Sequence, residues 1–230
     1  MMKKLVIILP AFNEGTVIGS VISDIKSALP QLKLNTEIVV VNDGSTDKTG
    51  VEAAAAGAIV LTHRINRGMG ASLGTGLAYA KKSGADVAVT MDSDGQHDAN
   101  DIAPLIEPII KGKAEVVIGS RRLDDSENMP KSRKLINFAS NLLTRIIFGI
   151  WTSDSLSGFR AFSRKAIKLI EIRTERMETS NEFFQQIREH RLKVAEVPIK
   201  VIYTDYSLAK GQKPGNAFAI IFRLLLRLFR

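Results

Sequence analysis

Residues 37–56 read EIVVVNDGSTDKTGVEAAAA, an apolar run that ends in a polar turn and continues into a helical pattern. The run Glu37–Asn42 has the length and the β-branched content of a buried strand. Asp43-Gly44-Ser45 suits a tight turn and a helix cap, and Thr46–Ala56 favours a helix. A strand that leads directly into a helix is the repeating unit of a parallel α/β sheet.

The same alternation extends in both directions from this unit. Short runs rich in Val and Ile predict four further buried strands, and the segments between them predict three further helices. The expected strands are Leu5–Leu9, Ala58–Thr62, Asp86–Asp92 and Glu115–Gly119, and the expected helices are Val17–Leu29, Gly70–Ser83 and Asp101–Lys111. This order predicts an α/β fold with an open, doubly wound, mostly parallel sheet.

The second half of the chain is less regular. A polar segment, Asp124–Lys134, precedes an apolar helical pattern near Leu135–Ile150. Glu182–His190 favours a helix, and Val194–Ile202 favours a strand or strand pair with an edge break at Pro198. We expect one folded domain over residues 1–208, followed by a basic amphipathic segment over residues 209–230.

Composition places the chain among ordinary folded proteins. The chain has 230 residues, of which 45% are hydrophobic and 24% are charged, and it contains no cysteine, which excludes disulfides and thiolate metal sites. The net charge of +8 favours anionic partners. No basic stripe carries interleaved aromatic residues, so we expect no nucleic-acid partner. The sequence leaves open whether the chain forms a homo-oligomer.

The amino-terminal residues predict a buried strand rather than a leader peptide. Met1-Met2-Lys3-Lys4 precedes an apolar run that is short and interrupted by Pro10, with no small-residue cleavage site after it. No stretch reaches the ~20 apolar residues that a spanning helix needs. These features predict a cytoplasmic protein.

Polar residues follow all five strands expected in the first half of the chain. In an open α/β sheet, ligands bind beyond the carboxyl ends of the strands. The segments at these positions are Pro10–Glu14, Asn42–Asp47, Arg64–Gly70, Asp92–Gln96 and Gly119–Arg122. They bring carboxylates, arginines and glycines to one edge of the sheet, which therefore predicts a binding site.

Asp92, Asp94 and Gln96 form the segment with the clearest chemistry. Hard divalent cations such as Mg²⁺ or Mn²⁺ prefer oxygen ligands and commonly use one or two carboxylates together with substrate phosphates. A metal ion at this strand end would stabilise the charge that develops on a diphosphate leaving group. The alternative is a solvated, aspartate-rich turn.

Other segments are open to two interpretations. Arg64–Gly70 brings cations and glycines to a helix start, where backbone amides favour anions, but close helix packing explains the glycines equally well. This segment matches neither the P-loop nor the dinucleotide fingerprint. Pro10–Glu14 and Asn42–Ser45 also suit simple strand exits with helix caps. His63, His97 and His190 show no partnered pattern and are typical of bystanders.

These segments, together with Ser157–Phe162, resemble glycosyltransferase family 2 over nearly the whole chain. The resemblance is to its polyprenyl-phosphate branch, typified by dolichol-phosphate mannosyltransferases. It implies a nucleotide-diphospho-sugar transferase (GT-A) fold and inversion at the anomeric carbon of the sugar. The partners it implies are a nucleotide diphosphate sugar, a polyprenyl phosphate lipid and an anionic membrane surface.

The resemblance also implies roles for individual residues. Pro10, Phe12, Glu14 and Asp43 would hold the nucleoside, with Arg67, Lys210 and Lys213 near the diphosphate, and Asp92, Asp94 and Gln96 would organise the metal. Arg121 would meet phosphate at the reacting centre, Arg133 and Arg160 would meet the acceptor phosphate, and Glu182 or Glu178 matches an acidic position of the branch. Asp94, Arg121 and Glu182 are thus the expected catalytic residues. The sequence departs from the branch after Ile199, where the usual arginine is absent.

In the expected reaction, an oxygen of a lipid-linked phosphate attacks the anomeric carbon while the nucleoside diphosphate leaves. A phosphate is already anionic near neutral pH, so alignment and charge stabilisation suffice. A hydroxyl acceptor would instead need a carboxylate base, for which Asp154 and Glu182 are the candidates. The alternatives are therefore a family 2 transferase acting on a saccharide hydroxyl in cell-envelope polysaccharide synthesis, or a non-catalytic nucleotide-sugar binding module. The sequence names neither the sugar nor the base.

The carboxyl-terminal segment predicts a helix on the membrane surface. Ala217–Arg230 would span roughly 20 Å as a helix, short of the ~30 Å hydrocarbon core. Arg223, Arg227 and Arg230 would share one face, which suits the cytoplasmic, anionic leaflet. Leu135–Ile150 would add a second contact through one apolar face that holds Phe138, Leu142 and Ile146. The alternatives are a helix packed on the domain and a dimer contact.

Overall fold

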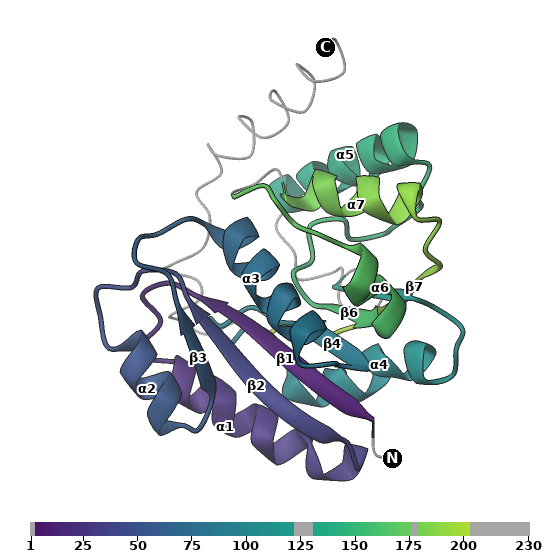
Figure 1. Ribbon diagram of the computed structural model, residues 1–230. Coiled ribbons are helices and arrows are strands. Elements are labelled where there is room, and N and C mark those ends of the chain that lie inside the picture. Colours follow the sequence, from purple (N-terminus) through teal and green to yellow (C-terminus); the bar gives the residue numbers. More distant parts are fainter. Residues whose placement is uncertain (1–2, 122–130, 176–178, 203–230) are drawn as a thin grey trace.

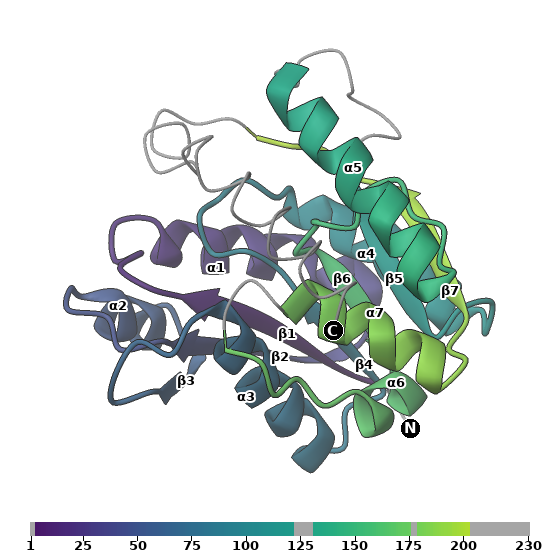
Figure 2. The same ribbon diagram turned by 90° about the horizontal axis from the view of Figure 1, so that it is seen from above.

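A seven-stranded sheet forms the centre of the molecule, with helices on both of its faces (Figures 1 and 2). The computed structural model describes residues 3–121, 131–175 and 179–202. The strands are β1 (Lys4–Ala11), β2 (Asn35–Asn42), β3 (Ile59–Thr62), β4 (Val87–Thr90), β5 (Val116–Ser120), β6 (Arg160–Ser163) and β7 (Val194–Pro198).

Helices connect most of these strands. The α-helices are α1 (Ile18–Ala28), α2 (Thr49–Ala55), α3 (Met69–Lys82), α4 (Ile102–Ile110), α5 (Lys131–Phe148), α6 (Arg164–Leu169) and α7 (Thr179–Glu189), and two 3₁₀ turns lie at Pro30–Leu32 and Ala99–Asp101. Within the described residues, no helix is long and apolar enough to cross a membrane.

The strand order is β3-β2-β1-β4-β6-β5-β7, so the predicted doubly wound and mostly parallel sheet is confirmed. β1 pairs in parallel with both β2 and β4, while β5 pairs in parallel with β7. β6 was not predicted as a strand, and it runs antiparallel between β4 and β5. The strand order reverses between β1 and β4, and open α/β sheets bind their ligands in the crevice at the carboxyl ends of the strands at such a point.

Alternate side chains of the strands feed two separate cores. Leu5, Ile7 and Leu9 of β1 point to the face covered by α1 and α4, whereas Val6 and Ile8 point to the face covered by α3 and α7. A strand segment buried on both faces is apolar at every position, as Leu5–Leu9 of β1 is. Gly76 of α3 lets the helix backbone approach β1 closely, because a Cβ there would lie 2.2 Å from Ile8.

Two predicted boundaries differ from the structure. The helix expected over Thr46–Ala56 begins only at Thr49, because the Asp47 carboxylate accepts hydrogen bonds from the backbone of Thr49 and of Gly15 and so holds a turn in front of the helix. The strand expected over Val194–Ile202 ends at Pro198, as the edge break predicted. The segment expected over residues 209–230 lies outside the described residues.

Candidate active site

The loops after β1 and β2 are joined by hydrogen bonds between backbone and side chains. The backbone N–H of Asn13, at φ 55°, donates to Ser45 Oγ (3.0 Å), and Asn13 Oδ1 accepts from the backbone of Thr46 (2.9 Å). The backbone N–H of Glu14 donates to Thr49 Oγ1 (2.8 Å). The two segments predicted to hold a nucleoside are therefore fixed relative to each other at the crevice between β1 and β4.

Pro10, Phe12 and Glu14 occupy different depths of this first loop. The carbonyl oxygen of Pro10 accepts a hydrogen bond from Ser93 Oγ (2.7 Å), which ties the end of β1 to the segment after β4. Phe12 is an exposed aromatic residue beside the buried Glu14. A nucleoside base stacks on an exposed aromatic ring and is bound through polar groups, so this pair suits the predicted role.

Asp43 lies at the end of β2, where it organises the loop before α3. Its Oδ1 contacts His63 Nδ1 (2.7 Å) and accepts from the backbone of Arg67 (3.0 Å), and its Oδ2 accepts from the backbone of Gly68 (2.7 Å). The other ring nitrogen of His63 contacts Thr75 Oγ1 on α3 (2.9 Å). The buried Asp43 carboxylate thus fixes residues 67–68 at the helix start; its contact with a nucleoside stays a prediction.

Arg67 lies at the surface above this loop. Its guanidinium pairs with the Glu175 carboxylate (2.9 Å), and both side chains are about half exposed. An exposed ion pair is weak and exchanges readily for a more highly charged anion. Arg67 is therefore placed where a diphosphate could compete for it.

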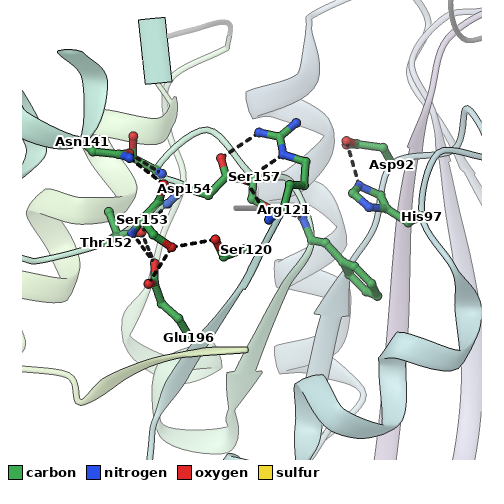
Figure 3. Close-up of polar contacts among 12 residues, drawn as sticks. Asp92, His97, Ser120, Arg121, Asn141, Thr152, Ser153, Asp154, Ser157 and Glu196 are labelled. Atoms are coloured by element: carbon green, nitrogen blue, oxygen red, sulfur yellow. Dashed lines mark hydrogen bonds and ion pairs between the residues drawn. The ribbon is translucent and has the colours of Figure 1, made fainter. Parts of the chain in front are cut away.

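Asp92 follows β4, and its carboxylate pairs with His97 (Figure 3). His97 Nε2 lies 3.2 Å from Asp92 Oδ2, while a Cβ at Gly158 would lie 2.6 Å from Oδ1. Burial alone would raise the pKa of Asp92, but the hydrogen bond from His97 and the charges of His97 and Arg121 bring that pKa below its usual value. The carboxylate is thus kept ionised and in one orientation.

Asp94 lies on the same loop and accepts a hydrogen bond from the backbone N–H of Gln96 (3.0 Å). Burial, and then the negative charge of Asp92, raise the pKa of the Asp94 carboxyl. Two neighbouring carboxylates that repel each other in a partly buried site are a donor set that a divalent cation stabilises.

The described residues contain no group of three His, Cys, Asp or Glu side chains arranged around one metal position. The protein would therefore supply Asp92 and Asp94, and the remaining ligands would come from diphosphate oxygens and water, as is common for Mg²⁺. The residues present fit such an ion. Gln96 contributes its backbone to the loop, and its carbonyl accepts from Ile202 (2.8 Å).

Arg121 follows β5 and forms a bidentate ion pair with Asp154 (Figure 3). Its Nε and Nη2 lie 2.6 and 2.7 Å from the two carboxylate oxygens, and Asp154 is fully buried. Fork-to-fork pairs of this kind are geometrically specific as well as strong. The Arg121 side chain remains 25% exposed.

Arg160 of β6 is a buried cation beneath the site. Its guanidinium lies 4.1 Å from the centre of the Phe183 ring, and Nη2 donates to the carbonyl of Ser155 (3.1 Å). Burial lowers the pKa of Arg160 to about 10, so the side chain stays protonated at neutral pH. Its positive charge acts on Asp92 and Asp154 from below; its contact with an acceptor phosphate stays a prediction.

Residues 6–170 match the sequence pattern of Glycosyl transferase family 2. The chain belongs to this family. The predicted resemblance to its polyprenyl-phosphate branch is confirmed by the relatives of the chain. A UDP-N-acetylglucosamine–dolichyl-phosphate N-acetylglucosaminyltransferase of Methanococcus voltae is 36% identical, covering 97% of this chain and 96% of its own. An undecaprenyl-phosphate mannosyltransferase of Micrococcus luteus is 30% identical, covering 91% of this chain and 87% of its own.

A solved structure with the same fold is glucosyl-3-phosphoglycerate synthase from Mycobacterium tuberculosis. It superimposes with a TM-score of 0.70 at 22% identity, over 98% of this chain and 78% of the other, and that crystal contains Mn²⁺ and uridine diphosphate. The similarity confirms the predicted GT-A fold for this family 2 transferase.

The remaining predicted residues of the transferase lie further from the crevice or outside the described residues. The Glu182 carboxylate accepts hydrogen bonds from the backbone of Arg173 (2.9 Å) and from the backbone and hydroxyl of Thr174 (2.8 and 2.7 Å). Arg133 lies near the start of α5, but its side chain is not described. Glu178, Lys210 and Lys213 lie outside the described residues.

Sequence reasoning missed three pairs in this transferase. His63 and His97 were left without partners, and the structure places each beside an aspartate, Asp43 and Asp92. Asp154 was considered only as a base for a hydroxyl acceptor, whereas it is the partner of Arg121. The available signal was position, because every one of these residues follows a strand or lies in a loop next to one.

Proposed function

We propose that this family 2 transferase moves a hexose from a nucleotide diphosphate sugar to the phosphate of a polyprenyl lipid, with inversion at the anomeric carbon. The two relatives described above support the acceptor class, since one is named for dolichyl phosphate and the other for undecaprenyl phosphate. Their names differ in the sugar, so the sugar and the base of the donor are left to experiment. The proposed place of work is the cytoplasmic surface of a membrane.

The contacts of the two candidate bases, Asp154 and Glu182, are the main support for this proposal. Asp154 is fully buried in its ion pair with Arg121, and the carboxylate of Glu182 accepts from backbone and hydroxyl groups. A saccharide hydroxyl needs a base to remove its proton, whereas a phosphate oxygen attacks without one. Because both carboxylates are engaged, the geometry supports a phosphate acceptor over a hydroxyl acceptor.

The side chains of the crevice then divide the work. Asp92, oriented by His97 and Gly158, and Asp94 would hold a Mg²⁺ or Mn²⁺ ion; when bound, such an ion stabilises the negative charge of the departing diphosphate. Arg121, aligned by Asp154, presents positive charge to phosphate at the reacting centre. The ordered loop from Asn13 to Glu14 holds the nucleoside in place, which supplies the alignment on which the reaction depends.

The direct test is a transfer assay with the purified full-length chain. Radiolabelled UDP-N-acetylglucosamine, UDP-glucose and GDP-mannose are each offered with a polyprenyl phosphate, with an oligosaccharide or with no acceptor. We expect one donor to give labelled lipid, and we expect chelator to stop the transfer and added Mn²⁺ or Mg²⁺ to restore it. Transfer to the oligosaccharide without transfer to the lipid would overturn the proposal.

A comparison of the KM values for the two substrates tests the predicted acceptor contact. Arg133→Ala should raise the KM for the lipid phosphate more than the KM for the nucleotide sugar, because it removes a charge-assisted contact to the acceptor alone. Equal effects on both constants would reject this role for Arg133.

A further inference from the structure

Helix α5 turns a stripe of large apolar side chains outward and buries two polar residues on its inner side. Asn137 and Thr144 are buried against the domain, with exposed fractions of 6% and 5%. Phe138, Leu142 and Ile146 point outward, with exposed fractions of 58%, 45% and 66%. Their spacing of four residues puts these three side chains on one stripe of the helix. A surface helix normally buries that stripe against the core.

The inward polar face has a clear structural task. Asn141 donates from Nδ2 to the carbonyl of Ser153 (2.6 Å) and accepts at Oδ1 from the backbone of Ser155 (2.9 Å), while Ser140 and Ser155 share a hydroxyl hydrogen bond (2.8 Å). These contacts hold the segment that carries Asp154. Phe148 at the end of α5 also packs on the Phe184 ring of α7, with 6.3 Å between the ring centres, whereas Phe138, Leu142 and Ile146 stay exposed.

Trp151, three residues beyond the end of the helix, is a further exposed apolar side chain, with an exposed fraction of 69%. The guanidinium of the exposed Arg145 lies 4.7 Å from the centre of the Trp151 ring. Tryptophan is enriched at membrane–water interfaces, and arginine there reaches the anionic headgroups. The apolar residues of the helix extend along only about 12 Å of its axis, which is small for a stable protein–protein interface. The net charge of +8 complements an anionic bilayer.

We propose that the outer face of α5, formed by Phe138, Leu142, Ile146 and Trp151, lies in the headgroup–acyl boundary of an anionic bilayer, with the helix axis in the plane of the membrane. Through Asn141 the same helix holds the Ser153–Ser155 segment, whose Asp154 aligns Arg121. The membrane-facing surface and the phosphate-binding edge are thus joined by one helix. The benefit to catalysis rests on the proposed function, but the contact itself does not.

Trp151 is the single tryptophan of the chain, so its fluorescence reports this surface alone. The full chain is mixed with vesicles of phosphatidylglycerol and phosphatidylcholine, with and without brominated acyl chains. We expect the emission to shift to shorter wavelength and to be quenched by the brominated lipid. Vesicle binding with an unquenched, unshifted Trp151 would overturn the proposal, because another segment would then make the contact.

A double variant, Phe138→Ser with Ile146→Ser, tests the stripe in the same vesicles by flotation. Burial of each large apolar side chain contributes a factor of about ten or more in partitioning, so the variant, which removes two of them, should bind roughly a hundredfold more weakly. Val51→Ser is the matched control, because Val51 is 68% exposed and belongs to α2, which packs at the β3 edge of the sheet and lies apart from α5 (Figure 1). Circular dichroism confirms that both variants fold. Equal flotation of the double variant and the control would overturn the proposal.

Two acceptors separate this proposal from the proposed function. The double variant should keep its turnover with a short, water-soluble polyprenyl phosphate and lose it with a long-chain acceptor embedded in vesicles. If the wild-type chain transfers to neither acceptor, the proposed function fails, while Trp151 quenching still decides the membrane contact. A concentration-dependent dimer that the double variant abolishes, with no quenching of Trp151 in the wild-type chain, would instead assign the stripe to a second copy and overturn the proposal.

Discussion

Gly158→Ala should disable the enzyme while leaving its fold intact. Gly158 precedes β6, and its carbonyl accepts a hydrogen bond from Thr90 Oγ1 (2.8 Å), so the backbone there is pinned. A Cβ at this position would lie 2.6 and 2.9 Å from the two carboxylate oxygens of Asp92. Ordinary contact begins near 3.4 Å, so the nearer oxygen must move by about 0.8 Å or the strand must shift.

This movement should lower the catalytic rate more than the stability of the fold. Asp92 is also held by His97, so a carboxylate that moves away from Gly158 disturbs that contact as well. A displacement of about 1 Å in a catalytic constellation costs on the order of 10²-fold in rate, whereas overpacking by one methyl group costs about 1–3 kcal/mol of stability. We therefore expect roughly a hundredfold loss of kcat/KM and a raised requirement for Mn²⁺, with a modest fall in Tm.

The assay is initial-rate transfer over a Mn²⁺ titration, paired with thermal unfolding. Gly19→Ala in α1 is the matched control, because a Cβ at Gly19 meets nothing within 4 Å. In a helix this change should stabilise the protein by about 0.4–1 kcal/mol and leave the rate unchanged. Wild-type turnover and an unchanged Mn²⁺ requirement in Gly158→Ala would refute the argument that Asp92 is held between Gly158 and His97.

Three further outcomes are expected. Asp94→Asn should lower transfer by at least about a hundredfold, because it removes one of two carboxylates at the metal position, and comparable turnover in excess chelator would contradict the metal requirement. Asp154→Asn should destabilise the protein by about 2–4 kcal/mol in thermal unfolding, because it breaks a buried bidentate pair with Arg121; an unchanged Tm would show that the pair is dispensable. Glu115→Gln should lose about 1 kcal/mol or less at pH 7, because the hydrogen bond from Lys165 lowers the pKa of Glu115 below its usual value. Since that stability is present above the usual pKa and is lost as pH falls through the lowered one, wild type and Glu115→Gln should unfold alike near pH 2; a difference that persists there would rule out the ion pair as its source.

The first half of the fold could be predicted because its central strands are buried along most of their length. Leu5–Leu9 is apolar throughout and lies in β1, and Ile38–Val41 is the apolar run of the expected strand Glu37–Asn42, which lies in β2. β6 could not be predicted in this way, because Arg160 opens it with a charge. That charge is hidden only by tertiary contacts, above all with the ring of Phe183. A four-residue strand whose burial depends on a distant helix leaves no local pattern.

The candidate site was likewise predictable only for the residues whose place a strand defines. The strand ends placed Asp92, Asp94 and Arg121 correctly at one edge of the sheet, because topology alone brings those positions together. Their partners were not predicted. Asp154 is 33 residues from Arg121 along the chain, and no periodic pattern links the two. Pairing of this kind depends on the path of the chain between β5 and β6, which sequence patterns did not define.

The position of β6 also determines when the sheet can be completed during synthesis of the chain. β3, β2, β1 and β4 form a contiguous parallel unit from the first part of the chain, but the free edge of β4 pairs only with β6, which begins about 70 residues later. At a synthesis rate of about 5–20 residues per second, the edge of β4 stays unpaired for roughly 4–14 s. An unpaired strand edge is a template for association with other chains. Synonymous codon changes that slow translation between β4 and β6 should therefore lower the yield of folded protein, although they alter no residue.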